Sequence, residues 1–136
     1  MREEGSLSFG VFSSSARTID AHGINESVRR AINRGLAALI PNPKGVEVFL
    51  DGLLSAPSEY RQETITHGDA LVPIISLASV IAKVCRDRYM SETVAKQYPE
   101  YGFGRHKGYG TREHLSALSR FGPSAIHRIS FLKMFA

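Results

Sequence analysis

The alternation of apolar and polar positions divides this 136-residue chain into stretches typical of strands and of helices. Residues 6–14 alternate large apolar side chains with serine and glycine, which predicts a β-strand. From Asn25 the apolar residues recur at helical spacing opposite arginines, which predicts an amphipathic helix capped by Asn25 and ended by Pro41. The apolar run at residues 46–50 predicts a second strand. The order strand, helix, strand indicates an α/β fold class.

The second half of the chain is predicted to be mainly helical. A short extended piece is expected at residues 63–66, after a turn-rich polar stretch. Residues 73–98 begin with a proline, which suits a first helical turn, and carry apolar residues at helical spacing, so we expect a long and largely buried helix. After a break, Thr111 is expected to cap a short helix that runs to residue 121 and ends at a Gly-Pro pair.

From the length and charge of the chain, we expect one domain with a basic C-terminal part. Its length is close to the usual domain size, so residues 1–136 are expected to be a single domain with a helical, basic C-terminal part from about residue 98. The net charge is +4. From residue 105 on, one acid, Glu113, faces Arg105, His106, Lys107, Arg112, His114, Arg120, His127, Arg128 and Lys133. This excess suits a polyanionic partner, and the alternative is a solvated basic face.

Several function classes are disfavoured by single residue types. Cys85 is the only cysteine, which excludes an intrachain disulfide or a thiolate metal cage, and we expect it to be a buried, inert thiol. The five histidines lack the spacing of a zinc site, and only His67 is expected near a functional site. No apolar run reaches the length of a membrane span, and residues 1–4 lack the apolar core of a signal peptide, so we expect a cytoplasmic protein.

Two aspartates are the first candidates for chemistry. Asp51 closes the strand at residues 46–50, and in open α/β sheets the carboxyl ends of strands face the ligand crevice. Asp69 follows in a His67-Gly68-Asp69 turn. Carboxylates of this kind suit Mg²⁺, which takes one or two of them together with water and phosphate oxygens. The alternative for Asp69 is that it caps the helix expected from Pro73.

A loop at residues 105–110 has the groups that bind a nucleic-acid backbone. Arg105 and Lys107 offer cations to phosphates, and Tyr109 between two glycines offers a flat surface to a sugar or base. The alternative is an ordinary glycine-rich turn.

The long helix at residues 73–98 also carries a polar stripe at steps of three and four, formed by Ser76, Ser79, Lys83 and Arg86 or Asp87. One interpretation is a stripe of small residues that lets the helix lie close to the sheet. The other is direct contact with substrate.

The order of these blocks resembles the type 2 ribonuclease H family (ribonuclease HII). The matching blocks are Asp51-Gly52, His67-Gly68-Asp69 with Val72-Pro73, the run Ile75 to Val84 with Arg86-Asp87-Arg88, Tyr101-Gly102-Phe103, His106-Lys107-Gly108-Tyr109 with Thr111, Gly122-Pro123, and His127-Arg128 with Ser130-Phe131. The resemblance implies a ribonuclease H-like fold, with an N-terminally truncated mixed sheet and flanking helices. It also implies an endonuclease that uses Mg²⁺ or Mn²⁺ to cleave RNA in RNA–DNA hybrids or single ribonucleotides in DNA.

The resemblance implies roles for individual residues. Asp51 and Asp69 match two of four metal-binding, catalytic carboxylates, and Tyr109 matches a tyrosine that stacks on the sugar at the RNA–DNA junction. Asp87 matches a structural residue that pairs with an arginine. The expected nucleic-acid contacts are Tyr109, Lys107, Arg105, Ser76 and Lys83.

The other two family carboxylates belong to a first-strand Asp-Glu-x-Gly-Arg-Gly motif that these residues do not contain. We therefore expect weak metal binding and little turnover by this chain alone, an unpartnered strand at residues 6–14, and exposed apolar surface on the long helix. The missing part is expected upstream or in a separately encoded half, and the chain is otherwise expected to be a monomer. Leu53 stands where the family has asparagine. The alternatives are a non-catalytic hybrid-binding fragment and an inactive α/β fragment.

Overall fold

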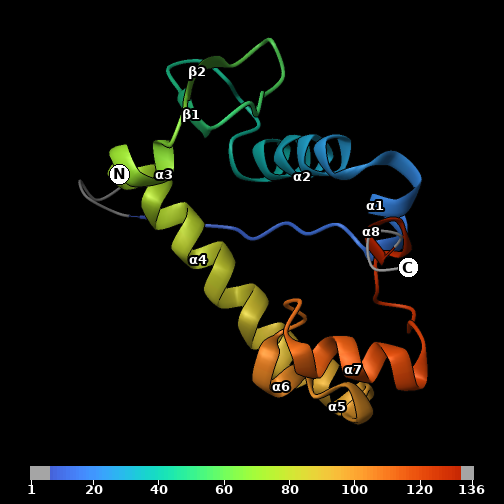
Figure 1. The fold of residues 1–136 in the computed structure, drawn as a ribbon. Helices are drawn as coiled ribbons and strands as arrows, with labels where there is room; N and C mark the ends of the chain where they lie inside the picture. The colour runs from blue at the N-terminus through green and yellow to red at the C-terminus, as the bar shows by residue number, and fades with distance from the viewer. Residues whose placement is uncertain (1–6, 133–136) are drawn as a thin grey trace.

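The computed structural model describes residues 7–132 (Figure 1). In chain order the elements are α1 (Ala16–His22), α2 (Ile24–Leu39), β1 (Glu47–Asp51), β2 (Arg61–Ile65), α3 (Gly68–Leu71), α4 (Pro73–Tyr89), the π-helix η1 (Met90–Val94), α5 (Ala95–Gln97), the 3₁₀ helix η2 (Pro99–Tyr101), α6 (Phe103–His106), α7 (Arg112–Phe121) and α8 (Ile129–Leu132). The expected α/β class is confirmed. Expectations for residues 1–4, Ser6 and Lys133 fall outside the described residues.

The predicted strand at residues 6–14 is wrong. Residues 7–15 are extended and pass between α2 and α4 (Figure 1), but they form no strand. Alternation tells which side chains share a face, whereas a strand also needs a neighbouring backbone, and none pairs with this segment within the described residues. The segment is held at its end, where Ser14 Oγ donates to the Ser27 carbonyl at 3.1 Å and Arg34 Nη2 donates to the Ser13 carbonyl at 2.6 Å.

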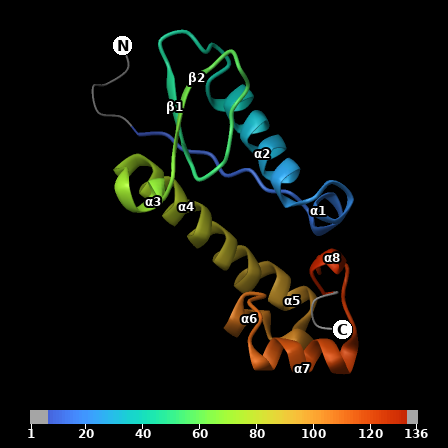
Figure 2. The ribbon, with the colours of Figure 1, turned by 45° about the horizontal axis from the view of Figure 1, so that its top comes forward.

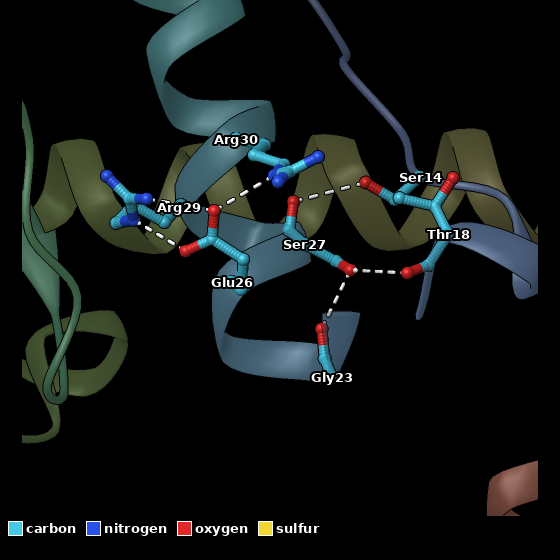
Figure 3. Close-up of polar contacts among 7 residues, drawn as sticks. All are labelled: Ser14, Thr18, Gly23, Glu26, Ser27, Arg29 and Arg30. Atoms are coloured by element: carbon cyan, nitrogen blue, oxygen red, sulfur yellow. Dashed lines mark hydrogen bonds and ion pairs between the residues drawn. The ribbon is translucent and has the colours of Figure 1, made fainter. Parts of the chain in front are cut away.

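The predicted amphipathic helix is confirmed as α2, but its cap is not Asn25. Gly23, at φ 79°, occupies the N-cap position without a side-chain bond and separates α2 from the unpredicted α1, which Ser15 caps by accepting from the Thr18 N–H at 3.1 Å. Figure 3 shows the polar contacts at the junction between α1 and α2. The buried Ser27 donates its hydroxyl to the Gly23 carbonyl at 2.8 Å.

On the outer side of the same helix, Glu26 pairs with Arg29 at 2.8 Å and Arg30 at 2.9 Å (Figure 3). These contacts fit a solvated helix face, and they place the apolar face of α2 toward α4 and the extended segment.

The two strands are parallel and lie side by side in both ribbon views (Figure 1 and Figure 2). Their register runs from Glu47 opposite Arg61 to Asp51 opposite Ile65, which confirms both predicted extended pieces within two residues. The buried Tyr60 donates its hydroxyl to the Ile40 carbonyl at 2.7 Å and so anchors the start of β2 to the end of α2.

The long predicted helix is confirmed in extent, because α4, η1 and α5 together cover residues 73–97. Its predicted burial is wrong. Of α4 only Ile75 is buried, while Val80 is 55% exposed and Val84 is 49% exposed. Helical spacing of apolar residues identifies a face but not its cover, and the described residues place no second layer over this one. The expectation of exposed apolar surface on the helix therefore holds.

An apolar cleft of about 690 Å³ lies between α2, the extended segment and α4. Phe12, Leu36 and Leu77 are among the side chains that line it. No helix among the described residues is long and apolar enough to cross a membrane.

The far end of α4 carries a compact helical unit, separated along α4 from the strands (Figure 2). Its core consists of Val94, Tyr101, Phe103 and Ala117. Helix α7 begins and ends as predicted: the Thr111 hydroxyl accepts from the His114 N–H at 3.2 Å, and Gly122 follows the last turn.

Helix α8, near the C-terminus, contacts α1 near the N-terminus. Asp20 of α1 accepts from the Ile129 and Ser130 N–H groups at 2.8 and 3.0 Å, which fixes α8 against α1 (Figure 1). The Ser130 hydroxyl also donates to Asp20, and this bond, followed by the backbone bonds from Ser130 and Ile129, lowers the pKa of Asp20.

Candidate functional site

Asp51 is held at the carboxyl end of β1 by a backbone donor from the next helix. Its Oδ1 accepts the Gly68 N–H at 2.8 Å, and the side chain is half-buried. Among residues 7–132, Oδ2 accepts no hydrogen bond. The strand end therefore presents one anchored and one unengaged carboxylate oxygen.

Gly68 packs closely against the start of α4. A Cβ added there would lie 2.7 Å from Ile75 Cδ1 and 3.5 Å from Asp51 Oδ1, so the end of the Ile75 side chain would have to shift to admit it. His67, at φ 56°, turns the chain in the left-handed region just before this close contact. The turn is thus packed tightly onto both the end of β1 and the start of α4.

Asp69 follows directly, in the first turn of α3, and is exposed. The alternative role of Asp69 as a cap of the helix from Pro73 is wrong, because Val72 occupies that position without a side-chain cap. The Gly68 contact instead brings the short helix that carries Asp69 to the end of β1. His67, just before this helix, is also exposed.

The ligand atoms available at the end of β1 are of the type that a hard divalent cation prefers. Carboxylate oxygens are what Mg²⁺ and Mn²⁺ prefer, and Asp51 and Asp69 belong to adjoining elements. In the described part of the chain, no three His, Cys, Asp or Glu side chains gather to hold a metal. The residues present would therefore supply two ligands.

The loop with Tyr109 lies at the other end of α4. Tyr109 is 50% exposed, and the Arg86 guanidinium of α4 lies 4.9 Å from its ring centroid. Gly108, at φ 81°, packs on η1, because a Cβ there would be 3.2 Å from Met90 Cε. The predicted loop at residues 105–110 is partly wrong, since Arg105 and His106 belong to α6.

Each predicted basic contact already has a partner within the chain. The Lys107 ammonium donates to the Gly104 carbonyl, and Arg105 pairs with Glu113 through Nε at 2.8 Å. The partner of Lys107 is thus a carbonyl of α6, and the partner of Arg105 is an acid in the first turn of α7.

On α4, Lys83 Nζ lies 2.6 Å from Asp87 Oδ2, and Arg86 Nη1 lies 3.3 Å from Asp87 Oδ1. Asp87 thus pairs with an arginine, as expected, and also with a lysine. The hydrogen bond from Lys83 lowers the pKa of Asp87, and the same bond raises the pKa of Lys83. Ser76 is half-buried near the start of α4, and Cys85 is half-buried rather than fully buried.

The predicted site residues form two groups rather than one. Asp51 and Asp69 belong to β1 and α3, which lie at the start of α4 in Figure 1, and Ser76 is in the first turn of α4. Lys83 lies further along α4, and Tyr109 lies under Arg86, near the last turn of that helix. At a rise of about 1.5 Å per residue, the stretch of α4 from residue 75 to residue 86 is about 16 Å long.

Three histidines that the sequence placed on a basic surface are buried instead. His106, His114 and His127 are 6%, 6% and 8% exposed, and the nearest ring nitrogens of His114 and His127 are 3.0 Å apart. Burial is the main cause that lowers the pKa of His114 and of His127. Their spacing in the sequence does not reveal this cluster, because residues from α6, α7 and the following loop meet only after packing.

The chain matches a known family along most of its length. A profile of the family described as Ribonuclease HII matches residues 3–134. The Ribonuclease HII of Geobacillus thermodenitrificans is 43% identical over 129 residues, which cover 95% of this chain and 48% of that relative. The Ribonuclease HII of Ruminiclostridium cellulolyticum is 41% identical over 133 residues, which cover 98% of this chain and 51% of that relative. The chain thus spans about half the length of these curated relatives.

Proposed function

This chain belongs to the ribonuclease HII family, and on that premise we propose that it carries part of a divalent-metal site that cleaves RNA in RNA–DNA hybrids, including single ribonucleotides in DNA. One observation supports the proposal most. The Gly68 N–H bonds to Asp51 Oδ1 at 2.8 Å, and this contact joins the strand that ends in Asp51 to the helix that begins beside Asp69.

In this proposal Asp51 and Asp69 hold Mg²⁺ or Mn²⁺. The cation, when bound, stabilises charge on the phosphate and makes water a stronger nucleophile at neutral pH. The protein's part is to orient the Asp51 carboxylate, which the Gly68 N–H does by occupying Oδ1 and leaving Oδ2 for the ligand.

The duplex would be bound by the second group of residues. Tyr109 stacks on a sugar, and the cations of Lys107, Arg105 and Lys83 bind phosphates after exchanging their present partners for the substrate. Ser76, in the first turn of α4, belongs to the first group and would contact the nucleic-acid backbone near the carboxylates. A duplex lying along α4 would meet both groups.

We further propose that turnover needs more carboxylates than this site supplies. Two aspartates carry a charge of −2 against the +4 of two cations, so the ions would be held mainly by water and substrate. The first-strand Asp-Glu-x-Gly-Arg-Gly motif is not among these residues. The chain alone should therefore bind hybrids but cleave them slowly or not at all.

The test uses the 136-residue chain with an end-labelled RNA–DNA hybrid in Mg²⁺ or Mn²⁺, followed on a denaturing gel. We expect salt-sensitive binding and little cleavage. A fusion that adds the Asp-Glu-x-Gly-Arg-Gly segment of a longer family member should cleave, and Asp51→Asn or Asp69→Asn in that fusion should abolish cleavage. Rapid cleavage by the unfused chain would overturn the need for further carboxylates. A fully active Asp51→Asn fusion would overturn the role of Asp51.

A second candidate is a hybrid-binding segment without catalysis. The exposed Tyr109 beside Arg86 favours it, because this pair can stack on nucleic acid without any metal. The same fusion separates the two candidates, since a pure binder would bind the hybrid, lose affinity in Tyr109→Ala, and still not cleave.

A further inference from the structure

Two relays of hydrogen bonds run through buried imidazoles and hold the backbone at Gly108 and Tyr109. Each relay starts at a backbone N–H, which only donates, and ends at a backbone carbonyl, which only accepts. The direction of every bond between them follows from these two ends. The protonation state of each ring can therefore be assigned by counting protons.

The first relay ends at Tyr109. The Ser124 N–H donates to His127 Nδ1 at 2.9 Å, so the proton of a neutral His127 is on Nε2. That Nε2 lies 3.0 Å from His114 Nε2, which must accept, and His114 Nδ1 then donates to the Tyr109 carbonyl at 3.0 Å. The Ser124 hydroxyl lies 2.9 Å from the same nitrogen of His127 and can only donate to it.

The second relay starts at Gly108. Its N–H donates to His106 Nδ1 at 3.1 Å, and His106 Nε2 lies 2.7 Å from the Tyr101 carbonyl, to which it must donate. His106 also stacks on His114, with ring centroids 4.7 Å apart. The residue before Tyr109 and Tyr109 itself are thus each tied to a buried ring.

We propose that His106, His114 and His127 are positioning residues that hold Tyr109 for substrate contact, and that they do so only as neutral rings. This proposal rests on the proposed function, in which Tyr109 contacts the RNA–DNA hybrid. Adding a proton to any of the three rings places two donors face to face, so one bond of the relay must break. Protonation of His106 breaks its bond to the Gly108 N–H. Protonation of His114 breaks its bond to His127, and protonation of His127 breaks its bond to the Ser124 N–H, so acid loosens the support behind the Tyr109 loop.

The surroundings favour the neutral forms of His114 and His127. Phe103 lies at 5.5–5.6 Å, centroid to centroid, from all three imidazoles, and burial lowers the pKa of His114 and His127. Glu113 of α7, whose pKa is lowered by the hydrogen bond from Arg105 and by the charges of Arg105 and His106, is already paired with Arg105 of α6.

The other polar groups around the relays do not supply a counter-charge. From α4, Arg86 lies over Tyr109 and adds positive charge on that side. From η2, the hydroxyl of Tyr101 is engaged, since it donates to the Gly122 carbonyl at 2.6 Å. No charged partner among these groups stabilises an imidazolium.

The sign of the pH effect separates this arrangement from a surface patch. Histidines on a basic face gain charge as pH falls and strengthen nucleic-acid binding. The relays predict the opposite, a loss of affinity between pH 7.5 and 5.5. An aromatic stacking contact with nucleic acid is worth about 1–3 kcal/mol, so losing the contact of Tyr109 should weaken binding roughly tenfold.

The first experiment tests the relays without nucleic acid. Nitrogen-15 NMR of the histidines in the full chain at pH 7.5 should show the proton on Nε2 in His106 and His127, and on Nδ1 in His114. A proton on Nε2 of His114, or three charged rings at this pH, would overturn the inference whatever the chain binds.

The second experiment compares His114→Asn with His114→Gln. The Asn amide stands near Nδ1 and can still donate to the Tyr109 carbonyl, whereas the Gln amide stands near Nε2 and serves His127 instead. His114→Gln should bind a fluorescent RNA–DNA hybrid roughly tenfold more weakly than His114→Asn. His22→Asn, at the exposed end of α1, is the matched control and should bind as the unaltered chain does.

Combining His114→Gln with Tyr109→Ala tests whether His114 acts through Tyr109. If His114 acts through Tyr109, the His114→Gln effect on affinity should vanish in a Tyr109→Ala background. Equal losses in both His114 variants, or full additivity with Tyr109→Ala, would overturn positioning and leave a structural role. If Tyr109→Ala alone binds normally while the NMR assignments hold, the proposed contact between Tyr109 and substrate has failed and the relay geometry has not.

Discussion

Replacing Asp51 by asparagine and by alanine separates its structural bond from its proposed metal role. Asparagine keeps an acceptor for the Gly68 N–H and removes the charge, whereas alanine removes both. Gly68 is buried and its Cα region is packed against Ile75, so water cannot easily replace a lost acceptor. Alanine should therefore destabilise the fold more than asparagine, and both should lose the metal.

The expected losses in the free energy of unfolding follow from the hydrogen bond between the Gly68 N–H and Asp51. Leaving a buried N–H unpaired costs about 1–3 kcal/mol, and hydrogen bonds to charged groups contribute about 1.5–3 kcal/mol against about 0.5–1.5 for neutral ones. We therefore expect Asp51→Asn to lower the free energy of unfolding by about 1 kcal/mol and Asp51→Ala by about 2–3 kcal/mol. Since urea slopes are about 1–3 kcal/mol per molar, the alanine midpoint should fall by roughly 1 M and the asparagine midpoint by about half as much.

The assay is urea unfolding followed by circular dichroism, with and without Mg²⁺. A cation at about 100 times its Kd should add about 2.7 kcal/mol to the unaltered chain and nothing to either variant. Glu47→Gln is the matched control, because Glu47 is an exposed acid of the same strand, paired with Arg61 at 2.9 Å, and should change stability by less than about 1 kcal/mol. Equal destabilisation by the two Asp51 substitutions, or a Mg²⁺ effect that survives in Asp51→Asn, would refute the reasoning.

Three further outcomes are expected. Gly68→Ala should lower the free energy of unfolding by about 1–3 kcal/mol in urea, because its Cβ would lie 2.7 Å from Ile75 Cδ1, and an unchanged midpoint would contradict this packing. Phe103→Ala should cost about 3–5 kcal/mol by the same measurement, because its ring is 1% exposed, and a loss under 1 kcal/mol would show that the cluster of the helical unit collapses around the gap. The folded pKa values of His114 and His127 lie below the ordinary value of 6.5, so their stabilising contribution is complete above pH 6.5 and is lost as pH falls through the window below it; urea midpoints at pH 7.5 and 5.5 should show this loss, and equal midpoints would contradict it.

The sequence predicted correctly those elements whose ends depend on residues within about one turn. Helix α7 begins at its Thr111 cap and ends before Gly122, as predicted, because a cap and a terminating glycine act within one turn of the residues they fix. Strand β1 and the extent of α4 were also predicted from runs and spacing. The pairing of Asp87 with an arginine was expected from the family resemblance, and both residues lie on one helix.

The errors concern contacts between distant segments. The alternation at residues 6–14 describes a chain with two unlike faces, but it cannot supply the neighbouring backbone that makes a strand. Likewise, the charge count placed His106, His114 and His127 on a basic surface, since the sequence does not say that α6, α7 and the loop after α7 meet around Phe103. The roles of Asp51, Asp69 and Tyr109 remain predictions, and the structure adds how each is held.

Helix α4 links the two groups of proposed functional residues by contacts at its ends. Near its start the buried Ile75 packs on Gly68 and so sets the Asp51 contact, and near its far end Arg86 lies over Tyr109. Between them Val80 is 55% exposed, so the middle of the helix gains little from burial. Most helical stability in proteins comes from tertiary packing rather than from intrinsic propensity. The distance between carboxylates and tyrosine is therefore fixed by packing at the two ends of α4, and loosening either end would uncouple metal binding from duplex binding.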